Sequence, residues 1–77
     1  MNLIKIPRES ANDNEVEVVE LCFSDGSFVS KGDVIALVEG EKSVYEVDST
    51  GEGYIYYLEK IENIISIDGD LAVLFET

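Results

Sequence analysis

The chain has 77 residues, of which 45% are hydrophobic, and it carries a formal net charge of −12 with no histidine. Its size fits one small domain, and its charge argues against nucleic acid and against an anionic membrane surface as partners, because both are bound through clustered Lys and Arg. The lack of histidine excludes Ser-His and Cys-His nucleophilic catalysis, and one cysteine without histidine cannot complete a four-ligand zinc site.

The elements predicted along the chain are almost all β-strands. Short runs rich in Val, Ile, Leu and Tyr are separated by turn sequences that contain Gly, Asp, Asn or Ser. The segment 58–65 has the length for a helical turn, but its match to an earlier segment favours a strand. In chain order, the predicted strands are 3–6, 16–23, 28–29, 34–38, 44–47, 54–58, 64–65 and 71–75, with polar connections at 9–15 and 48–53.

Two copies of one sequence unit make up most of the chain, at about residues 16–39 and 53–76. The copies align at an offset of 37 residues, which places Gly69-Asp70 on Gly32-Asp33. Between these anchors, apolar residues fall on apolar residues. Further matched pairs are Val18 with Ile55, Leu21 with Leu58, Phe28 with Ile65, Val34 with Leu71, Leu37 with Leu74, Val38 with Phe75 and Glu39 with Glu76.

The repeat predicts an all-β architecture in a single domain that covers residues 1–77. Eight short strands with closely spaced turns are typical of a sandwich or flattened barrel, and two similar halves imply two sheets related by an approximate twofold axis. In this alignment Asn63 takes the place of Gly26, where we expect a turn residue with a positive φ. The hairpin that joins the halves is expected to project from one edge, far from both termini.

Lys42 is the candidate functional residue. It lies in the joining hairpin between two β-branched runs, and it is flanked by Glu39 and Glu41. It is also the only basic residue between Lys31 and Lys60. A solvated lysine kept for solubility is one interpretation. The other is that a rigid hairpin holds the amine clear of its neighbours, so that another enzyme can acylate it.

No other residues form a recognisable site. Seventeen carboxylates approach one another by chance in a chain of this size, so no acid–base pair stands out, and Asp68-Gly69-Asp70 lacks the ligand spacing of a calcium loop. Cys22 is expected to be a small core residue within a strand. We expect Tyr54, Tyr56 and Tyr57 to pack on a sheet with their hydroxyls in water. We therefore predict no catalytic residue and no metal site.

The single cysteine also excludes an internal disulfide framework and is typical of a reducing compartment. No apolar run is long enough to span a membrane, and the first residues lack the long apolar stretch of a signal peptide. We therefore expect a cytoplasmic location.

With these features, the chain resembles the biotinyl/lipoyl attachment domains, and the lipoyl branch in particular. Residues 25–33, Asp-Gly-Ser-Phe-Val-Ser-Lys-Gly-Asp, are similar to the family's acidic-Gly-Asp-x-Val-x-Lys-Gly-acidic stretch. Residues 39–43, Glu-Gly-Glu-Lys-Ser, are similar to its Glu-Thr-Asp-Lys-Ala, in which the lysine carries lipoate. The resemblance covers nearly the whole chain and implies a flattened barrel of two four-stranded sheets.

The resemblance implies that Lys42 is joined to lipoate by a lipoyl ligase or transferase. It also implies that Gly32 and Glu39 help the modifying enzyme to choose its lysine, while Glu41 retains the acidic residue that precedes it. The domain would then be a swinging-arm carrier without catalysis of its own. Its implied partners are a 2-oxo acid dehydrogenase, an acyltransferase core and a dihydrolipoyl dehydrogenase.

Several departures leave alternatives open. The biotin branch places methionine on both sides of its lysine, so Glu41 and Ser43 make biotin the weaker choice of cofactor. Gly40 stands where the family has Thr, and Ser66 where it is usually apolar. An unmodified spacer or protein-interaction module, with its acidic surface steered towards a basic partner, is the alternative from another class. The chain is either a trimmed domain or a free-standing carrier, and its start at Met1 favours the second.

Overall fold

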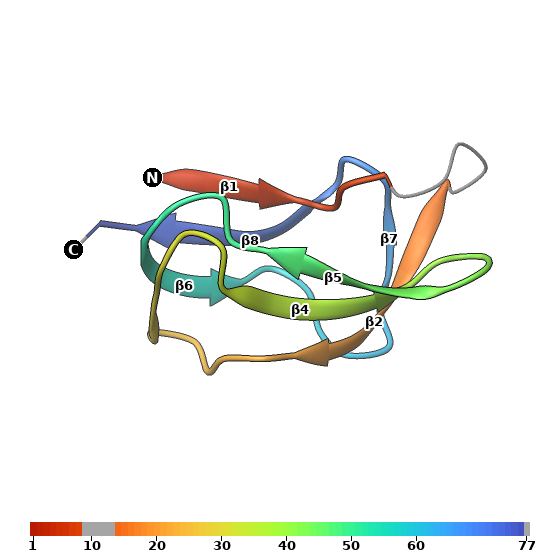
Figure 1. Ribbon diagram of the computed structural model, residues 1–77, viewed down its shortest axis with the longest axis horizontal. Helices are drawn as coiled ribbons and strands as arrows, with labels where there is room; N and C mark the ends of the chain where they lie inside the picture. The colour runs from red at the N-terminus through yellow and green to blue at the C-terminus, as the bar shows by residue number, and fades with distance from the viewer. Residues whose placement is uncertain (9–13, 77) are drawn as a thin grey trace.

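The computed structural model describes residues 1–8 and 14–76, and it contains eight strands in two antiparallel sheets (Figure 1). One sheet has the order β1-β8-β6-β3 and the other the order β5-β4-β2-β7, and the two stack as a flattened sandwich that is not closed into a barrel. The strands are β1 (Asn2–Lys5), β2 (Glu15–Leu21), β3 (Phe28–Val29), β4 (Val34–Glu39), β5 (Val44–Asp48), β6 (Gly53–Tyr57), β7 (Ile64–Ser66) and β8 (Asp70–Phe75).

The predicted fold class is therefore confirmed, and every predicted strand is present with its ends moved by at most two residues. Most of the predicted loop 9–15 lies outside the described residues, and its last residue, Glu15, opens β2. The segment 58–65, which has the length of a helical turn, forms a turn followed by β7. Within the described part of the chain, no helix is long and apolar enough to cross a bilayer.

The core lies between the two sheets and is built mainly from β-branched side chains. Such side chains suit the pleated surface of a strand, where successive residues point to opposite faces. The largest fully buried side chains come from both sheets and from the ends of their strands: Ile4, Ile6, Val16, Val18, Val29, Ile35, Val38, Val47, Ile55, Leu71 and Leu74. The buried Ser49 donates a hydrogen bond of 2.6 Å from its hydroxyl to the Gly51 carbonyl oxygen, so its burial leaves no unpaired polar group.

A pseudo-twofold relation links the two sheets. Replacing each strand by the one four places along the chain converts the order β1-β8-β6-β3 into β5-β4-β2-β7. Individual hydrogen bonds repeat as well. The Cys22 N–H donates to the Ile35 carbonyl at 2.9 Å, and the Leu58 N–H donates to the Leu71 carbonyl at 2.8 Å. These two bonds match at an offset of 36 residues, not 37.

The change of offset comes from a β-bulge in β2. Val18 holds the place in β2 that Ile55 holds in β6, as the offset of 37 predicts, but Leu21 holds the place of Tyr57 rather than Leu58. Between Val18 and Glu20 the pairing of β2 with β4 skips one residue, and β6 has no such irregularity in its pairing with β8. One extra residue in β2 therefore moves all later matches by one position.

The turns of the two halves follow the same corrected register. Gly26 has a φ of 89° and its counterpart is Glu62, with a φ of 78°, so the prediction that Asn63 takes this conformation is wrong. Gly32, with a φ of 91°, likewise corresponds to Asp68, with a φ of 69°, and not to Gly69. Gly69 is explained by packing, because an added Cβ would lie only 2.8 Å from Ile65 Cγ2 and from the Ser66 oxygen.

The bulge also corrects the prediction for Cys22. Because an extra residue reverses the in-out alternation of a strand, Leu21 and Phe23 pack against the core and Cys22 is exposed instead of buried. Tyr54 and Tyr56 lie exposed on their sheet, as predicted. Tyr57 differs, because its hydroxyl donates to the Ile35 carbonyl at 2.7 Å and accepts from the Phe23 N–H at 3.2 Å.

Candidate functional site

Lys42 lies at the tip of the hairpin between β4 and β5. The last strand pair is Glu39 with Val44, and the Gly40 N–H then donates to the Ser43 carbonyl at 2.8 Å. Glu41 and Lys42 are therefore the two residues that make the turn, and neither has a positive φ. The tip is short and hydrogen-bonded at its base, which restricts the backbone conformation of the two turn residues.

The pattern of β5 fixes which residues reach that tip. Tyr45 and Val47 point into the core, whereas Val44, Glu46 and Asp48 point outwards. A slip of one residue would bury carboxylates in place of apolar side chains, so the register is strongly specified. In addition, the Tyr45 hydroxyl donates a hydrogen bond of 2.9 Å to the carbonyl oxygen of Pro7, which follows β1.

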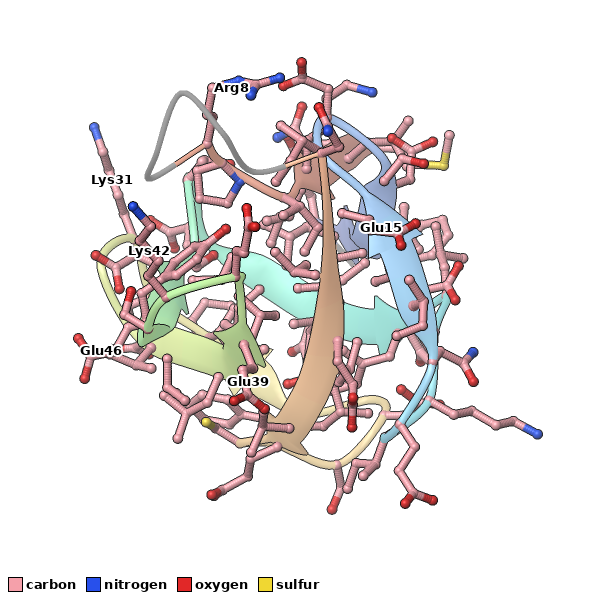
Figure 2. All side chains as sticks on the ribbon, turned by 90° about the vertical axis from the view of Figure 1, so that its right-hand side faces the viewer. Arg8, Glu15, Lys31, Glu39, Lys42 and Glu46 are labelled. Atoms are coloured by element: carbon pink, nitrogen blue, oxygen red, sulfur yellow. The ribbon has the colours of Figure 1, made fainter. Side chains whose placement is uncertain are left out.

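The Lys42 amine is open to a second protein. The side chain is exposed, and no hydrogen bond or ion pair engages its amine among the residues that the structure describes. Seen onto the hairpin end, Lys42 and Glu39 extend in different directions from the hairpin (Figure 2). The hairpin also lies at the end of the sandwich opposite both termini (Figure 1). The expected exposure and distance from the termini are thus both present.

A hollow of about 450 Å³ lies beside the hairpin, between its base and the start of β2. It is strongly acidic, because four of its eight lining residues are glutamates. The pairing of β2 with β4 creates this arrangement by placing Glu17 opposite Glu39. The lining residues are Asn14, Glu15, Val16, Glu17, Glu39, Gly40, Glu41 and Ile64.

The predicted site residues do not all lie near Lys42. It brings Glu39 and Glu41 to the hollow next to Lys42, and it adds Glu15 and Glu17, which the sequence did not single out. The sequence carries no local signal for these two, because their place beside the hairpin depends on the pairing of β2 with β4. Gly32 precedes β4 while Lys42 follows it, and a six-residue strand separates them by roughly 20 Å.

This arrangement fits covalent attachment of a cofactor. A primary amine that is exposed, without an ion pair in the described structure and held on a short hairpin, has the chemistry and access needed to form an amide. The hollow beside it is lined by carboxylates rather than by apolar side chains, so it suits recognition of a basic surface more than burial of a hydrophobic group.

Comparison with known families agrees with this geometry. A family profile described as "Biotin-requiring enzyme" matches residues 2–74, which is nearly the whole chain. A comparison with curated proteins finds no match. Domains of the matching family are carriers of covalently attached lipoate or biotin and are not themselves catalytic. The sequence, the fold and the exposed hairpin lysine of this chain agree with that description. The chain belongs to the biotin/lipoyl attachment domain family.

Proposed function

We propose that Lys42 carries lipoate and that the domain is the swinging-arm carrier of a 2-oxo acid dehydrogenase-type system. The observation that carries the proposal is the exposed amine at the tip of a short hairpin, which has no ion pair or hydrogen bond among the described residues and lies on the end of the sandwich opposite the termini. When attached, lipoate supplies a disulfide that accepts and releases acyl groups. The chain itself contributes the amine and the position in which it is held.

Lipoate is favoured over biotin by the residues on either side of Lys42. The resemblance gives the biotin branch a methionine on each side, whereas this chain has Glu41 and Ser43. Both side chains are exposed, so a modifying enzyme that approaches the amine meets them directly. A pocket shaped for two apolar thioethers would be left with a desolvated carboxylate and hydroxyl, which costs free energy of binding.

The acidic hollow supports recognition by a lipoyl ligase or transferase with a basic surface. Glu39 and Glu41 line it together with Glu15 and Glu17, so four carboxylates surround one approach to the hairpin. Clustered charge of one sign raises the rate of encounter with a surface of opposite sign, and salt screens this effect. We propose direct recognition roles for Glu39 and Glu41, and for Gly32 a role in holding the turn before β4.

The further proposed partners are a 2-oxo acid dehydrogenase, an acyltransferase core and a dihydrolipoyl dehydrogenase. The contribution of the carrier would be tethering, because linked sites meet at an effective concentration set by the length of the link rather than by free diffusion. Since the termini lie opposite Lys42, attachment of the domain to a larger assembly through either end would leave the arm free.

The test is modification of the full chain by a lipoyl ligase with ATP and lipoate, followed by intact-mass measurement. We expect the mass of one lipoyl group on the parent chain and none on Lys42→Arg. Lys31→Arg is the matched control, since Lys31 is also an exposed lysine in a turn, and it should be modified like the parent. A parallel reaction with a biotin ligase and biotin should leave the mass unchanged.

The alternative is an unmodified spacer or interaction module. It would be supported by an unchanged mass under conditions that fully modify a known lipoyl domain. Modification by the biotin ligase alone would instead make the chain a biotin carrier and would contradict the choice of lipoate. Modification of Lys42→Arg at the parental rate would place the acceptor on another lysine.

A further inference from the structure

The two sheets present very different outer faces, although the fold makes them equivalent. The strands of the β5-β4-β2-β7 sheet carry six carboxylates and no basic residue: Glu15, Glu17, Glu20, Glu39, Glu46 and Asp48. The strands of the β1-β8-β6-β3 sheet carry only Lys5 and Asp70, which pair with each other at 2.7 Å. The strands of one face are thus strongly acidic, and those of the other carry no net charge.

The pseudo-twofold relation compares these faces position by position. On the acidic sheet, Glu17 pairs with both Glu39 and Ile64; on the neutral sheet, Tyr54 pairs in the same way with Phe75 and Phe28. The next row matches equally, because Glu20 and Glu46 flank Leu37 just as Tyr56 and Leu3 flank Val73. Four exposed or partly exposed glutamates on one sheet are therefore replaced by three aromatic residues and a leucine on the other.

This comparison shows that the fold does not need apolar residues at these positions. The same backbone places tolerate carboxylates on the other half, where they lie at the surface. Instead, Phe28, Tyr54, Tyr56 and Phe75 remain 39% to 50% exposed and form two edge-to-face pairs, with ring centroids 5.4 Å and 5.6 Å apart. Exposed apolar patches of this kind on small domains commonly mark an interaction surface.

We propose that this aromatic face, formed by Leu3, Phe28, Tyr54, Tyr56 and Phe75, is the interface of a homodimer. At roughly 200 Å² per aromatic side chain, the exposed fractions leave on the order of 350 Å² of aromatic surface per chain. Two such faces would bury on the order of 700 Å² of aromatic surface in total, to which Leu3 adds, so the contact falls in the size range of weak, transient interfaces.

The distribution of charge selects a second copy as the occupant. The strands of this face offer no net charge to a basic partner, because Lys5 and Asp70 pair with each other. A second copy presents the same neutral surface, and a twofold arrangement needs only one self-complementary patch. The acidic sheets then point away from each other, which keeps most of the charge of the two copies apart. Glu52 and Glu76 line a hollow with Phe28 at the edge of this face. Their negative charges repel those of the second copy and so weaken the contact.

This inference does not rest on the proposed function, but the two are compatible. The aromatic face belongs to the sheet that lacks β4 and β5, so pairing through it leaves the Lys42 hairpin of each copy uncovered. The carboxylates at the edge of the face predict how the association of the dimer depends on salt. Because both copies are negatively charged, added salt should strengthen the association, whereas contact with a basic partner would be weakened by salt.

Sedimentation equilibrium of the full chain between about 10 µM and about 1 mM tests the proposal, with an expected dissociation constant on the order of 0.1 mM. We expect the constant to fall as NaCl rises from about 0.05 M to about 0.5 M. Phe28→Glu should weaken the dimer by about tenfold or more, as expected for an aromatic residue within an interface. Ile64→Glu is the matched control, because Ile64 is the equivalent residue on the acidic sheet and is 56% exposed.

Phe75→Glu is the second variant, since it installs the residue that stands at the equivalent position 39, and thermal melts of all variants check that they are folded. Amide NMR spectra recorded on dilution should localise the shifts to β3, β6 and β8. A monomer over the whole concentration range would overturn the proposal. So would equal weakening by Ile64→Glu, or an association that salt weakens.

Discussion

The Tyr45 hydroxyl donates a hydrogen bond to the Pro7 carbonyl oxygen across 2.9 Å, and it thereby joins the strand that follows Lys42 to the segment that follows β1. Tyr45 is 9% exposed, the bond is partly buried, and the residues it joins are 38 positions apart. The base of the hairpin is therefore attached to the segment that follows β1 of the other sheet as well as to β4.

Tyr45→Phe should lower the free energy of unfolding by about 1 kcal/mol, which is typical of one lost hydrogen bond. The Gly40 amide, which closes the base of the hairpin, should also exchange its hydrogen faster, because the hairpin loses one attachment. Urea unfolding and amide exchange measure the two effects. Tyr54→Phe is the control, since its exposed hydroxyl makes no hydrogen bond to the described residues, and an equal loss in both variants would contradict the role of the bond.

The left-handed glycines should differ in their tolerance of a side chain. Gly32 has a φ of 91° with open space around it, so Gly32→Ala should cost about 1–2 kcal/mol of unfolding free energy from backbone strain alone. Gly53→Ala should cost more, because its φ is 151° and the new Cβ would lie 2.6 Å from the Phe75 carbonyl oxygen. Gly32→Val should exceed Gly32→Ala, since a β-branched residue tolerates a positive φ least.

Gly51→Ala supplies the control for these measurements. It has no positive φ, and its added Cβ would meet only ordinary contacts at 3.9 Å. Its thermal unfolding midpoint should stay the same or rise slightly, because alanine restricts the unfolded chain. Unchanged unfolding of Gly32→Val would show that the turn before β4 can adopt another conformation.

Removing charge from the acidic hollow should slow modification of Lys42 without unfolding the domain. We expect Glu39→Ala and Glu39→Gln each to lower kcat/KM of a lipoyl ligase by roughly tenfold at low salt, with a smaller difference at high salt. Initial rates from intact-mass measurements give the values. Glu46→Gln is the matched control, because Glu46 is exposed on the same sheet but does not line the hollow. Equal rates for Glu39→Ala and the parent would refute recognition through this residue.

The Cys22 thiol should react slowly although it is exposed. Partial burial of its sulfur, followed by the nearby carboxylates of Glu20 and Glu46, raises the pKa of the thiol above its usual value. Less thiolate is then present at mildly alkaline pH, so alkylation by iodoacetamide should be slower in the folded chain than in urea. Glu20→Gln should lower the pKa of Cys22 and accelerate the reaction, whereas an unchanged rate would contradict the influence of that carboxylate.

The same shift has a defined effect on stability. Because the pKa of Cys22 is higher in the folded chain than in the unfolded chain, folding favours the protonated thiol. This contribution is complete below the unfolded pKa and is lost as the pH rises through the folded pKa. Cys22→Ser should therefore flatten the decline of the free energy of unfolding above about pH 8.5, which the pH dependence of urea unfolding measures.

Much of this protein follows from local sequence. The strands were predictable because Val, Ile and Tyr alternate with polar residues between turn sequences, and each of these preferences acts within a few residues. The Lys42 hairpin was predictable for the same reason, since its two strands are adjacent in the chain and the in-out pattern of Tyr45 and Val47 sets their register. The acidic residues next to Lys42 in sequence necessarily accompany it in space.

The register of the internal repeat could not be predicted from the same patterns. Residues 34–38 and 71–75 are unbroken apolar runs, so shifting one against the other by one position still places apolar on apolar. The bulge in β2 exists only through pairing with β4, whose residues lie about 20 positions further along the chain. No local rule marks Val19 as the extra residue, and that is why Cys22 was assigned to the wrong face and Asn63 to the wrong turn position.

The sequence alone determined the set of strands, their turns and the single lysine at the joining hairpin, because short-range conformational preferences and side-chain alternation are written into neighbouring residues. Only the tertiary structure decided that Glu15 and Glu17 share a hollow with Glu39, and that four aromatic rings gather on one outer face. Both arrangements depend on which strands pair across the sheets and in which register. The pairing and register are set by the free energy of the whole core, which the preferences of a short segment do not determine.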